Sequence, residues 1–250
     1  MENIYSRFFN PIVPPLVDLP EYESIHLQID MCDILSRVNN QSIYIIDYMH
    51  QAFLHVSPHP LFLCGYSADE VKAMGYSFYE KVISPDDLQM MENVNKLGWE
   101  LFYNISTELR KLSCISYDFF LHYKNNNKVL VNHKLTPLRM TKDGNIWLGL
   151  CIVNYSSHKT SGNVIYALEG NKQYYTYDFK KKQLVRYSPG KPTKREKEVL
   201  RLAMRGYNET EISERLNISV HTVKKHRQNT ERKLGVNNLT NAVTKFNLSF

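Results

Sequence analysis

Cysteines are few in this sequence and far apart. The four of them stand about 32, 50 and 37 positions apart in 250 residues, at Cys32, Cys64, Cys114 and Cys151. This spacing forms no CxxC pair and no Cys/His cluster, which argues against a metal site. Scattered cysteines in a chain of this length are typical of reduced core thiols, so we expect a cytoplasmic protein.

Long apolar runs are also missing. No stretch approaches the roughly 18 uninterrupted apolar residues that a membrane span needs. Residues 1–24 carry Pro14, Pro15, Pro20 and acidic residues, where a signal peptide has a basic start and an apolar run. We therefore expect no signal peptide and no membrane partner.

The residue patterns of common catalytic sites do not stand out either. No Ser/His/Asp arrangement, Gly-rich phosphate loop or paired carboxylate rises above background in the sequence. We therefore expect no catalytic residue, and the chain is not predicted to be an enzyme.

Positive charge is concentrated at one end of the chain. Residues 191–250 hold 13 Lys and Arg against 6 Asp and Glu, a balance of +7, while residues 1–190 hold 18 against 19, a balance of −1; together these give the net charge of +6. A compact basic segment at one end indicates a nucleic-acid-binding module. The near-neutral remainder predicts a second kind of domain.

The order of predicted elements divides the chain into four parts and indicates an α+β fold. Residues 1–40 form an irregular lead and a flanking helix. Residues 41–187 form a domain with an antiparallel sheet and helices, including extra strands after about 156. The Ser/Pro/Gly-rich stretch 188–192 is a predicted linker. Residues 193–250 form an all-α domain.

Within the first parts, residues 25–38 predict an amphipathic helix whose apolar stripe contains Ile25, Ile29, Cys32, Leu35 and Val38. Two short strands are expected at 42–48 and 52–57. Helices are expected after Ser67, after Ser84 and over 93–109. Three longer strands follow at 114–123, 129–138 and 146–155, and two or three more lie within 163–187. The run Lys180–Lys182 is interpreted as a solvated turn rather than a phosphate-binding patch.

This order of two strands, several helices and three long strands resembles a PAS domain over roughly 41–156. Two stretches are similar to PAS motifs: Gly65-Tyr66-Ser67-Ala68-Asp69-Glu70 and Ser84-Pro85-Asp86-Asp87, where His usually stands in place of Ser84. The resemblance implies a sensor or dimerisation domain.

The C-terminal part predicts a helix-turn-helix. Thr193 and Glu196 form a capping box for a first helix that ends near Gly206, and Asn208 with Glu211 forms another for a second. Asn217 tolerates the left-handed turn, and Ser219 caps a third helix that runs to Leu234. This spacing is typical of the motif.

The third helix separates into an apolar and a polar side. At about 100° per residue, Val223, Thr230 and Leu234 fall on one side. The other side offers Lys and Gln, which hydrogen-bond base edges or phosphates; its residues are His221, Lys224, Lys225, Gln228 and Arg232. This pattern favours DNA reading over an ordinary solvated face.

Over about 55 residues this segment resembles the C-terminal DNA-binding domain of the LuxR (GerE-type) family. The matching stretches include Glu211-Ile212-Ser213-Glu214-Arg215-Leu216, Thr222-Val223-Lys224-x-His226 and Lys233-Leu234-Gly235-Val236. The resemblance implies base reading by Lys224, Lys225 and Gln228, with His221 added from the same face. It implies phosphate contacts for Thr222, His226, Arg227 and Arg232. The chain departs from the family at Asn208-Glu209-Thr210, where a more basic start is usual.

Double-stranded DNA is therefore the predicted partner, with a second copy of the chain and RNA polymerase as further candidates. Dimer contacts are expected at the helix 25–38 and at a fourth helix, about Leu239–Asn247, that the resemblance implies. In the first domain, plain core aromatics are favoured over a ligand pocket for Phe78, Trp99, Phe102, Tyr117, Phe119 and Trp147. No cofactor is predicted, and an unidentified small molecule stays an open alternative.

Two functions remain open from the sequence. One is a sequence-specific regulator of transcription, in which the PAS-like domain senses a signal or dimerises and the LuxR-type domain reads the major groove. The alternative is a protein-interaction module, with a PAS-like docking domain and only non-specific DNA binding.

Overall fold

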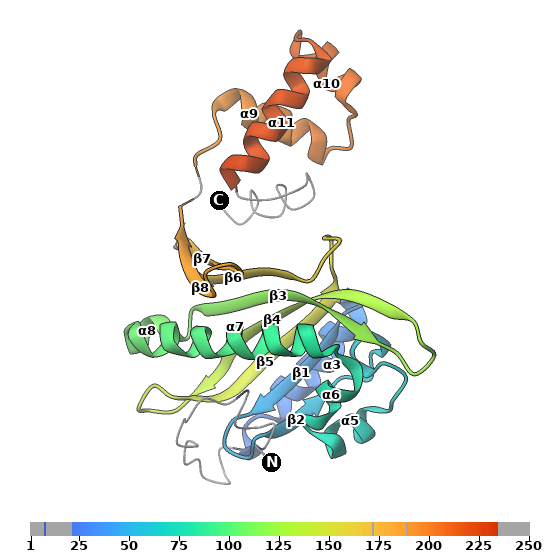
Figure 1. Cartoon of the computed structure of the whole chain (residues 1–250), viewed down its shortest axis with the longest axis vertical. Coiled ribbons are helices and arrows are strands. Elements are labelled where there is room, and N and C mark those ends of the chain that lie inside the picture. The colour runs from blue at the N-terminus through green and yellow to red at the C-terminus, as the bar shows by residue number, and fades with distance from the viewer. Residues whose placement is uncertain (1–7, 9–21, 172, 189, 235–250) are drawn as a thin grey trace. The chain divides into compact units, whose positions relative to one another are not determined.

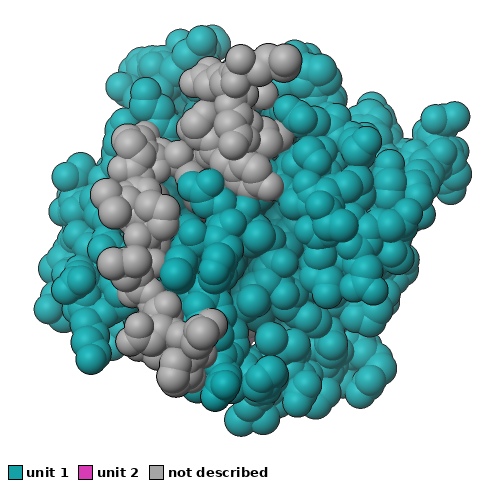
Figure 2. Space-filling view, turned by 90° about the horizontal axis from the view of Figure 1, so that it is seen from below, with its two compact units in different colours: residues 1–186 teal, residues 187–250 magenta. Residues whose placement is uncertain are grey.

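The computed structural model describes residues 8, 22–171, 173–188 and 190–234 (Figure 1). The chain divides into two units, Met1–Arg186 and Tyr187–Phe250. Figure 2 shows one face of the first unit in teal. The first unit combines a sheet with helices, and the described part of the second consists mainly of helices. The expected α+β class is confirmed.

One sheet of eight strands organises the first unit. Its order is β2-β1-β5-β4-β3-β6-β7-β8, and each neighbouring pair from β2 to β7 is antiparallel. The strands are β1 Ser42–Asp47, β2 Ala52–Val56, β3 Ser113–His122, β4 Lys128–Met140, β5 Ile146–Tyr155, β6 Gly162–Leu168, β7 Tyr174–Asp178 and β8 Gln183–Tyr187. The two short and three long strands predicted from periodicity are confirmed, and three further strands extend the sheet beyond β3.

The run Lys180–Lys182 lies in the turn between β7 and β8, and all three lysines are exposed. The interpretation of this run as a solvated turn is confirmed.

The helices between β2 and β3 are α4 Pro60–Leu63, α5 Ala68–Met74, α6 Ser77–Val82, α7 Pro85–Asn104 and α8 Thr107–Arg110. The capping box of Ser67 and Glu70 at the start of α5 is confirmed. The prediction of separate helices after Ser84 and over 93–109 was wrong, because one helix of 20 residues covers most of both. Its interior contains no proline that would break it. It ends at Asn104, and α8 is a separate short turn.

The two faces of the sheet carry different layers. Tyr44 and Ile46 of β1 join the large core under α4–α7, whereas Ile43 and Ile45 join a smaller core under α3 (His26–Asn39). Because successive side chains of a strand point to opposite faces, β1 contributes to both cores. All six of its residues are buried.

The prediction of a single apolar stripe along the helix 25–38 was wrong for the C-terminal half of the helix. Ile25 and Cys32 pack against the sheet, but Leu35 and Val38 are exposed. Ser36 takes the inward position one turn after Cys32, and its hydroxyl donates to the carbonyl of Gln41 at 2.7 Å. The helix therefore carries a second apolar side that does not face the sheet.

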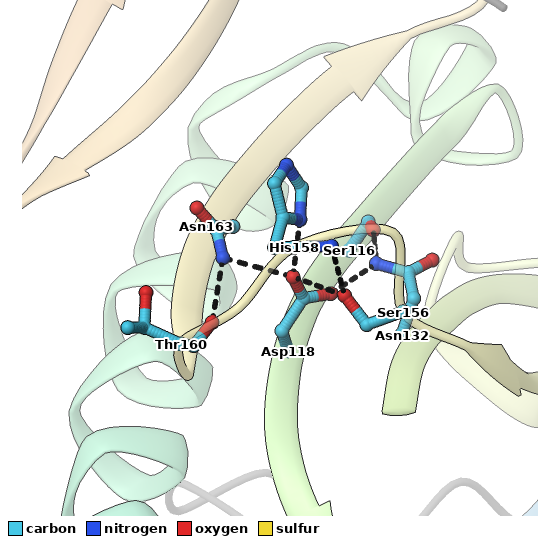
Figure 3. A network of polar contacts seen from close by, with 7 residues as sticks. All are labelled: Ser116, Asp118, Asn132, Ser156, His158, Thr160 and Asn163. Carbon is cyan, nitrogen blue, oxygen red and sulfur yellow. Dashed lines mark hydrogen bonds and ion pairs between the residues drawn. The ribbon is translucent and has the colours of Figure 1, made fainter. Parts of the chain in front are cut away.

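A buried carboxylate holds the connection between β5 and β6 (Figure 3). Asp118 of β3 is fully buried, and its Oδ2 contacts the Nδ1 of His158 at 2.5 Å. The same atom accepts from Ser156 and Asn163 at 2.9 Å each, and Oδ1 accepts from Asn132 at 2.7 Å. A buried charge is stable only where such partners satisfy it. The contacts therefore fix this connection to β3 and β4.

Candidate nucleic-acid interface and cavity

The described part of the second unit contains three helices: α9 Lys194–Met204, α10 Glu209–Leu216 and α11 Val220–Leu234. Val199, Ile212 and Val223 meet in its core, one from each helix. Both predicted capping boxes are present, and Asn217 takes the left-handed conformation at φ 50°. The helix-turn-helix prediction is confirmed. The implied fourth helix, with Leu239, Ala242, Val243 and Phe246, lies outside the described residues.

An ion pair ties α9 to the end of α11. The Nζ of Lys233 lies 2.8 Å from Oε2 and 3.0 Å from Oε1 of Glu196, whose side chain is buried. Burial raises the pKa of Glu196, but hydrogen bonds from Lys233 and Thr193 outweigh it, so the pKa lies below its ordinary value. The pair holds α11 by its C-terminal end and leaves the preceding turns free to present side chains.

The side chains of α11 divide as the periodicity predicts. Val223, Thr230 and Leu234 are buried against the unit. The opposite side exposes the predicted base-reading residues, which are His221, Lys224, Lys225 and Gln228. Their spacing along α11 gives one continuous face of donors, the chemistry that base edges and phosphates accept.

The predicted phosphate contacts are less uniform. Arg232 is exposed and donates to the Oδ1 of Asn229 at 3.1 Å, whereas Thr222, His226 and Arg227 are half-buried. The hydroxyl of Thr222 lies 2.8 Å from that of Ser219, inside the cap of α11. Among these four residues, Arg232 is the most accessible to a phosphate.

Glu209, the first residue of α10, contacts α11, which the residue patterns of the sequence do not predict. Its Oε1 accepts from Nη1 of Arg227 at 2.6 Å, and its Oε2 lies 3.6 Å from Nζ of Lys224. The only sequence signal was an acidic residue where LuxR-type domains are usually basic. An anionic group thus stands beside two of the predicted DNA contacts.

Two adjoining hollows lie in the large core of the first unit. Their empty volumes are about 360 and 400 Å³, counted with the space open to solvent. Tyr48, Asn95, Trp99 and Leu135 line both of them. The first is also lined by polar rings, among them Tyr76, Tyr79, Tyr117 and His133.

His133 is the chemically distinctive residue of this cavity. Its Nε2 lies 2.7 Å from the hydroxyl of Tyr44, which lies 2.7 Å from that of Tyr79. Its Nδ1 is buried and has no hydrogen-bond partner among the described residues. Burial lowers the pKa of His133 to about 3 and raises the pKa of Tyr44 and Tyr79 well above the usual value. These groups are therefore neutral at physiological pH.

The predicted pocket residues only partly meet there. Trp99 and Tyr117 line the first hollow, and Trp99 and Phe102 line the second. Phe78 and Phe119 are buried in the same core but line neither hollow. Trp147 lies in the smaller core under α3, on the other face of the sheet. Sequence alone could not find Asn95 and His133, because their patterns are those of an ordinary helix and strand.

Residues 193–246 match the sequence model of the family described as bacterial regulatory proteins, luxR family. The chain carries a LuxR-family domain. This match confirms the prediction of a regulator with a LuxR-type DNA-binding domain. No curated protein sequence matches the chain significantly.

Several solved structures share low similarity with the chain. One is the Vibrio cholerae VqmA dimer in the absence of target DNA, 14% identical with a TM-score of 0.33, over 92% of this chain and 86% of that one. A PAS domain from Colwellia psychrerythraea is 13% identical with a TM-score of 0.37, over 57% and 100%. At these values the likenesses say nothing about this chain's ligand or partners.

The described residues contain no group of three or more His, Cys, Asp or Glu that could hold a metal ion. All four cysteines are free thiols, and three of them are buried. None of the helices in the described ranges is long and apolar enough to cross a membrane.

The neutral state of His133 predicts how acid affects stability. A histidine has a pKa of 6.5 in a model peptide, against about 3 for His133 in the fold. Between these pH values the unfolded chain binds the proton and the folded chain does not. The neutral His133 therefore makes its full contribution to the free energy of unfolding above pH 6.5. As the pH falls below 6.5, the free energy of unfolding decreases by up to about 1.4 kcal/mol per pH unit.

Urea denaturation from pH 7 to pH 4 measures this slope. His133→Gln should make the dependence shallower, whereas His122→Gln, at an exposed position, should keep the wild-type slope. An unchanged slope in the His133 variant would contradict the prediction.

Proposed function

We propose that this chain is a homodimeric regulator of transcription that reads a specific DNA sequence with α11. The observation that carries the proposal is the exposed, donor-rich side of α11 on a capped helix-turn-helix. The basic charge of this part of the chain supports it, since cationic side chains release counterions from DNA on binding. As a DNA-binding protein of a bacterial regulatory family, it would act in the cytoplasm.

Base reading distinguishes this function from a module that only docks proteins and binds DNA non-specifically. Phosphate contacts position a protein on the duplex, and base contacts select the sequence. Gln228 is exposed near the middle of the face, between Lys224 and Arg232. An amide can pair with the donor and the acceptor that adenine presents in the major groove. We assign sequence selection to Gln228 and its neighbours, and phosphate binding to Arg232.

Two variants of α11 test this assignment. Gln228→Ala should weaken binding to the best site by about 1–3 kcal/mol and reduce discrimination at one base position. Arg232→Ala should weaken binding to all sequences similarly. It should also make the slope of the log binding constant against the log salt concentration shallower by about 0.9. Selection from a randomised duplex pool, followed by titration at several salt concentrations, measures both. Uniform weakening by the Gln228 variant would favour non-specific binding.

The proposed dimer contact is the outward side of α3. Leu27, Met31, Ile34 and Val38 are exposed by 70%, 45%, 43% and 71%. Their spacing of four, three and four residues is that of a coiled-coil seam. Water-exposed apolar residues that are continuous along a helix indicate a protein contact. A second copy of α3 has the matching spacing.

Charge complementarity favours two antiparallel helices in this contact. A two-fold axis near residue 32 places Leu27 opposite Val38 of the second copy and Met31 opposite Ile34. The exposed Asp30 then lies beside Arg37 of the other helix, and the axis makes this pair twice. A dimer also suits the proposed function, because two helix-turn-helix units read two half-sites.

A charge in the seam tests the dimer. Ile34→Glu should raise the dissociation constant at least about tenfold, because it would bury unpaired carboxylates. His26→Glu adds the same charge at an exposed position beside the seam and should leave the dimer intact. Sedimentation of the full chain measures both. A monomeric wild-type chain would contradict the proposed contact.

We further propose that the cavity in the first unit takes a small neutral molecule with a ring. Its lining combines stacked and edge-on aromatic faces with the amide of Asn95 and the unpaired Nδ1 of His133. None of the described residues that line the two hollows is Asp, Glu, Lys or Arg. A charged ligand would therefore lose its hydration without a counter-charge.

Phenol and benzoate are matched probes for this cavity. Phenol should raise the melting temperature with increasing concentration, while the benzoate anion of similar shape should not. Asn95→Leu should reduce the phenol effect, because it fills space and removes a polar group. Thermal unfolding of the full chain measures these shifts. Equal stabilisation by both probes, or by neither, would contradict the proposed ligand class.

A further inference from the structure

Glu209 has no role in the cap of α10, although it lies in the first turn. Asn208 and Glu211 form that cap, with the Oε2 of Glu211 accepting from the backbone N–H of Asn208 at 2.8 Å. Glu209 instead turns toward α11. Each of its carboxylate oxygens faces one cation, Arg227 at 2.6 Å and Lys224 at 3.6 Å.

This arrangement resembles the way a phosphate is held. A phosphate also presents anionic oxygens to Arg and Lys side chains, and Arg binds it through the same N–H groups. Lys224 belongs to the face of α11 assigned to DNA, and Arg227 lies about one turn further along the helix. A DNA phosphate that approaches them meets the negative charge of Glu209 at close range.

We propose that Glu209 substitutes for a DNA phosphate within the free protein and weakens its binding to duplexes of any sequence. The proposal rests on the DNA-binding function proposed above. Glu209 pairs with Arg227 and lies 3.6 Å from the exposed Lys224, so fewer counterions are released when the DNA backbone docks. Because the loss of counterion release is the same for every sequence, it lowers specific and non-specific affinities by the same factor. Glu209 therefore lowers the overall affinity for DNA without touching a base.

The alternative role for Glu209 is to position Arg227 for a phosphate contact. An arginine has five N–H donors, so one bond to Glu209 leaves others available. The two roles predict opposite effects when the carboxylate is removed. Loss of a competitor strengthens DNA binding, and loss of a positioning contact weakens it.

Glu209→Gln separates these roles, because it removes the charge and keeps the size of the side chain. On a duplex of arbitrary sequence, the affinity should rise about three- to tenfold, and the log–log salt slope should become steeper by about 0.9. Fluorescence anisotropy of a labelled duplex, titrated with the full chain at several salt concentrations, measures both. The ratio of specific to non-specific affinity should stay within about twofold of the wild-type ratio, because the gain is the same for every sequence.

Two further variants complete the experiment. Glu214→Gln removes the same charge from an exposed position of α10 and should change the affinity by less than about twofold. In an Arg227→Gln background, Glu209→Gln should lose most of its effect, which shows that Glu209 acts through Arg227. Melting temperatures of all variants confirm that they fold.

The outcomes distinguish this proposal from the proposed function. Wild-type protein that binds no duplex even at low salt would overturn both. Wild-type binding with an unchanged or weakened Glu209→Gln variant would overturn only the role of Glu209. If Glu214→Gln raised the affinity as much as Glu209→Gln does, the gain would come from net charge alone. That result would also overturn the role of Glu209.

Discussion

The first unit depends on the need to cover both faces of β1. Ile43 and Ile45 point one way, and Tyr44 and Ile46 point the other, and all four are buried. Burial of apolar area is the dominant favourable contribution to folding, so each face of the strand requires its own layer. The helices between β2 and β3 cover one face, and α3 covers the other. The proposed cavity and the proposed dimer seam both follow from this division.

Burial also determines the chemistry of the cavity. Tyr44, Tyr79 and His133 form a chain of hydrogen bonds in the core, where an ionised group would be costly. Each therefore stays neutral. An imidazole nitrogen without a partner is expensive in such a place, and polar groups of this kind are common where a ligand binds. The polarity of the site thus depends on its depth under the helices as much as on its residues.

Two similar ion pairs of the second unit differ in the role that we propose for them. Glu196 and Glu209 are both acidic residues in the first turn of a helix, and both pair with a cation of α11. Glu196 is buried and holds Lys233 at the end of the helix away from the predicted reading face. Glu209 is partly exposed, pairs with Arg227 and lies near Lys224 of that face. The two pairs differ in their position relative to the turns of α11 that we propose to read DNA, so we propose a structural role for Glu196 and a role in DNA binding for Glu209.

Much of this protein was determined by the sequence itself. Capping residues such as Thr193 and Asn208, the period of the strands and the polar side of α11 depend on local geometry, which neighbouring residues dictate. Tertiary structure alone decided the rest. Leu35 and Val38 are exposed because the sheet accommodates only one side of α3, and Trp147 and Trp99 lie on opposite faces of the sheet. His133 and Asn95 meet at the cavity because distant segments pack together. Such contacts join residues far apart in the chain, and hydrophobic periodicity does not predict which distant residues will pack together.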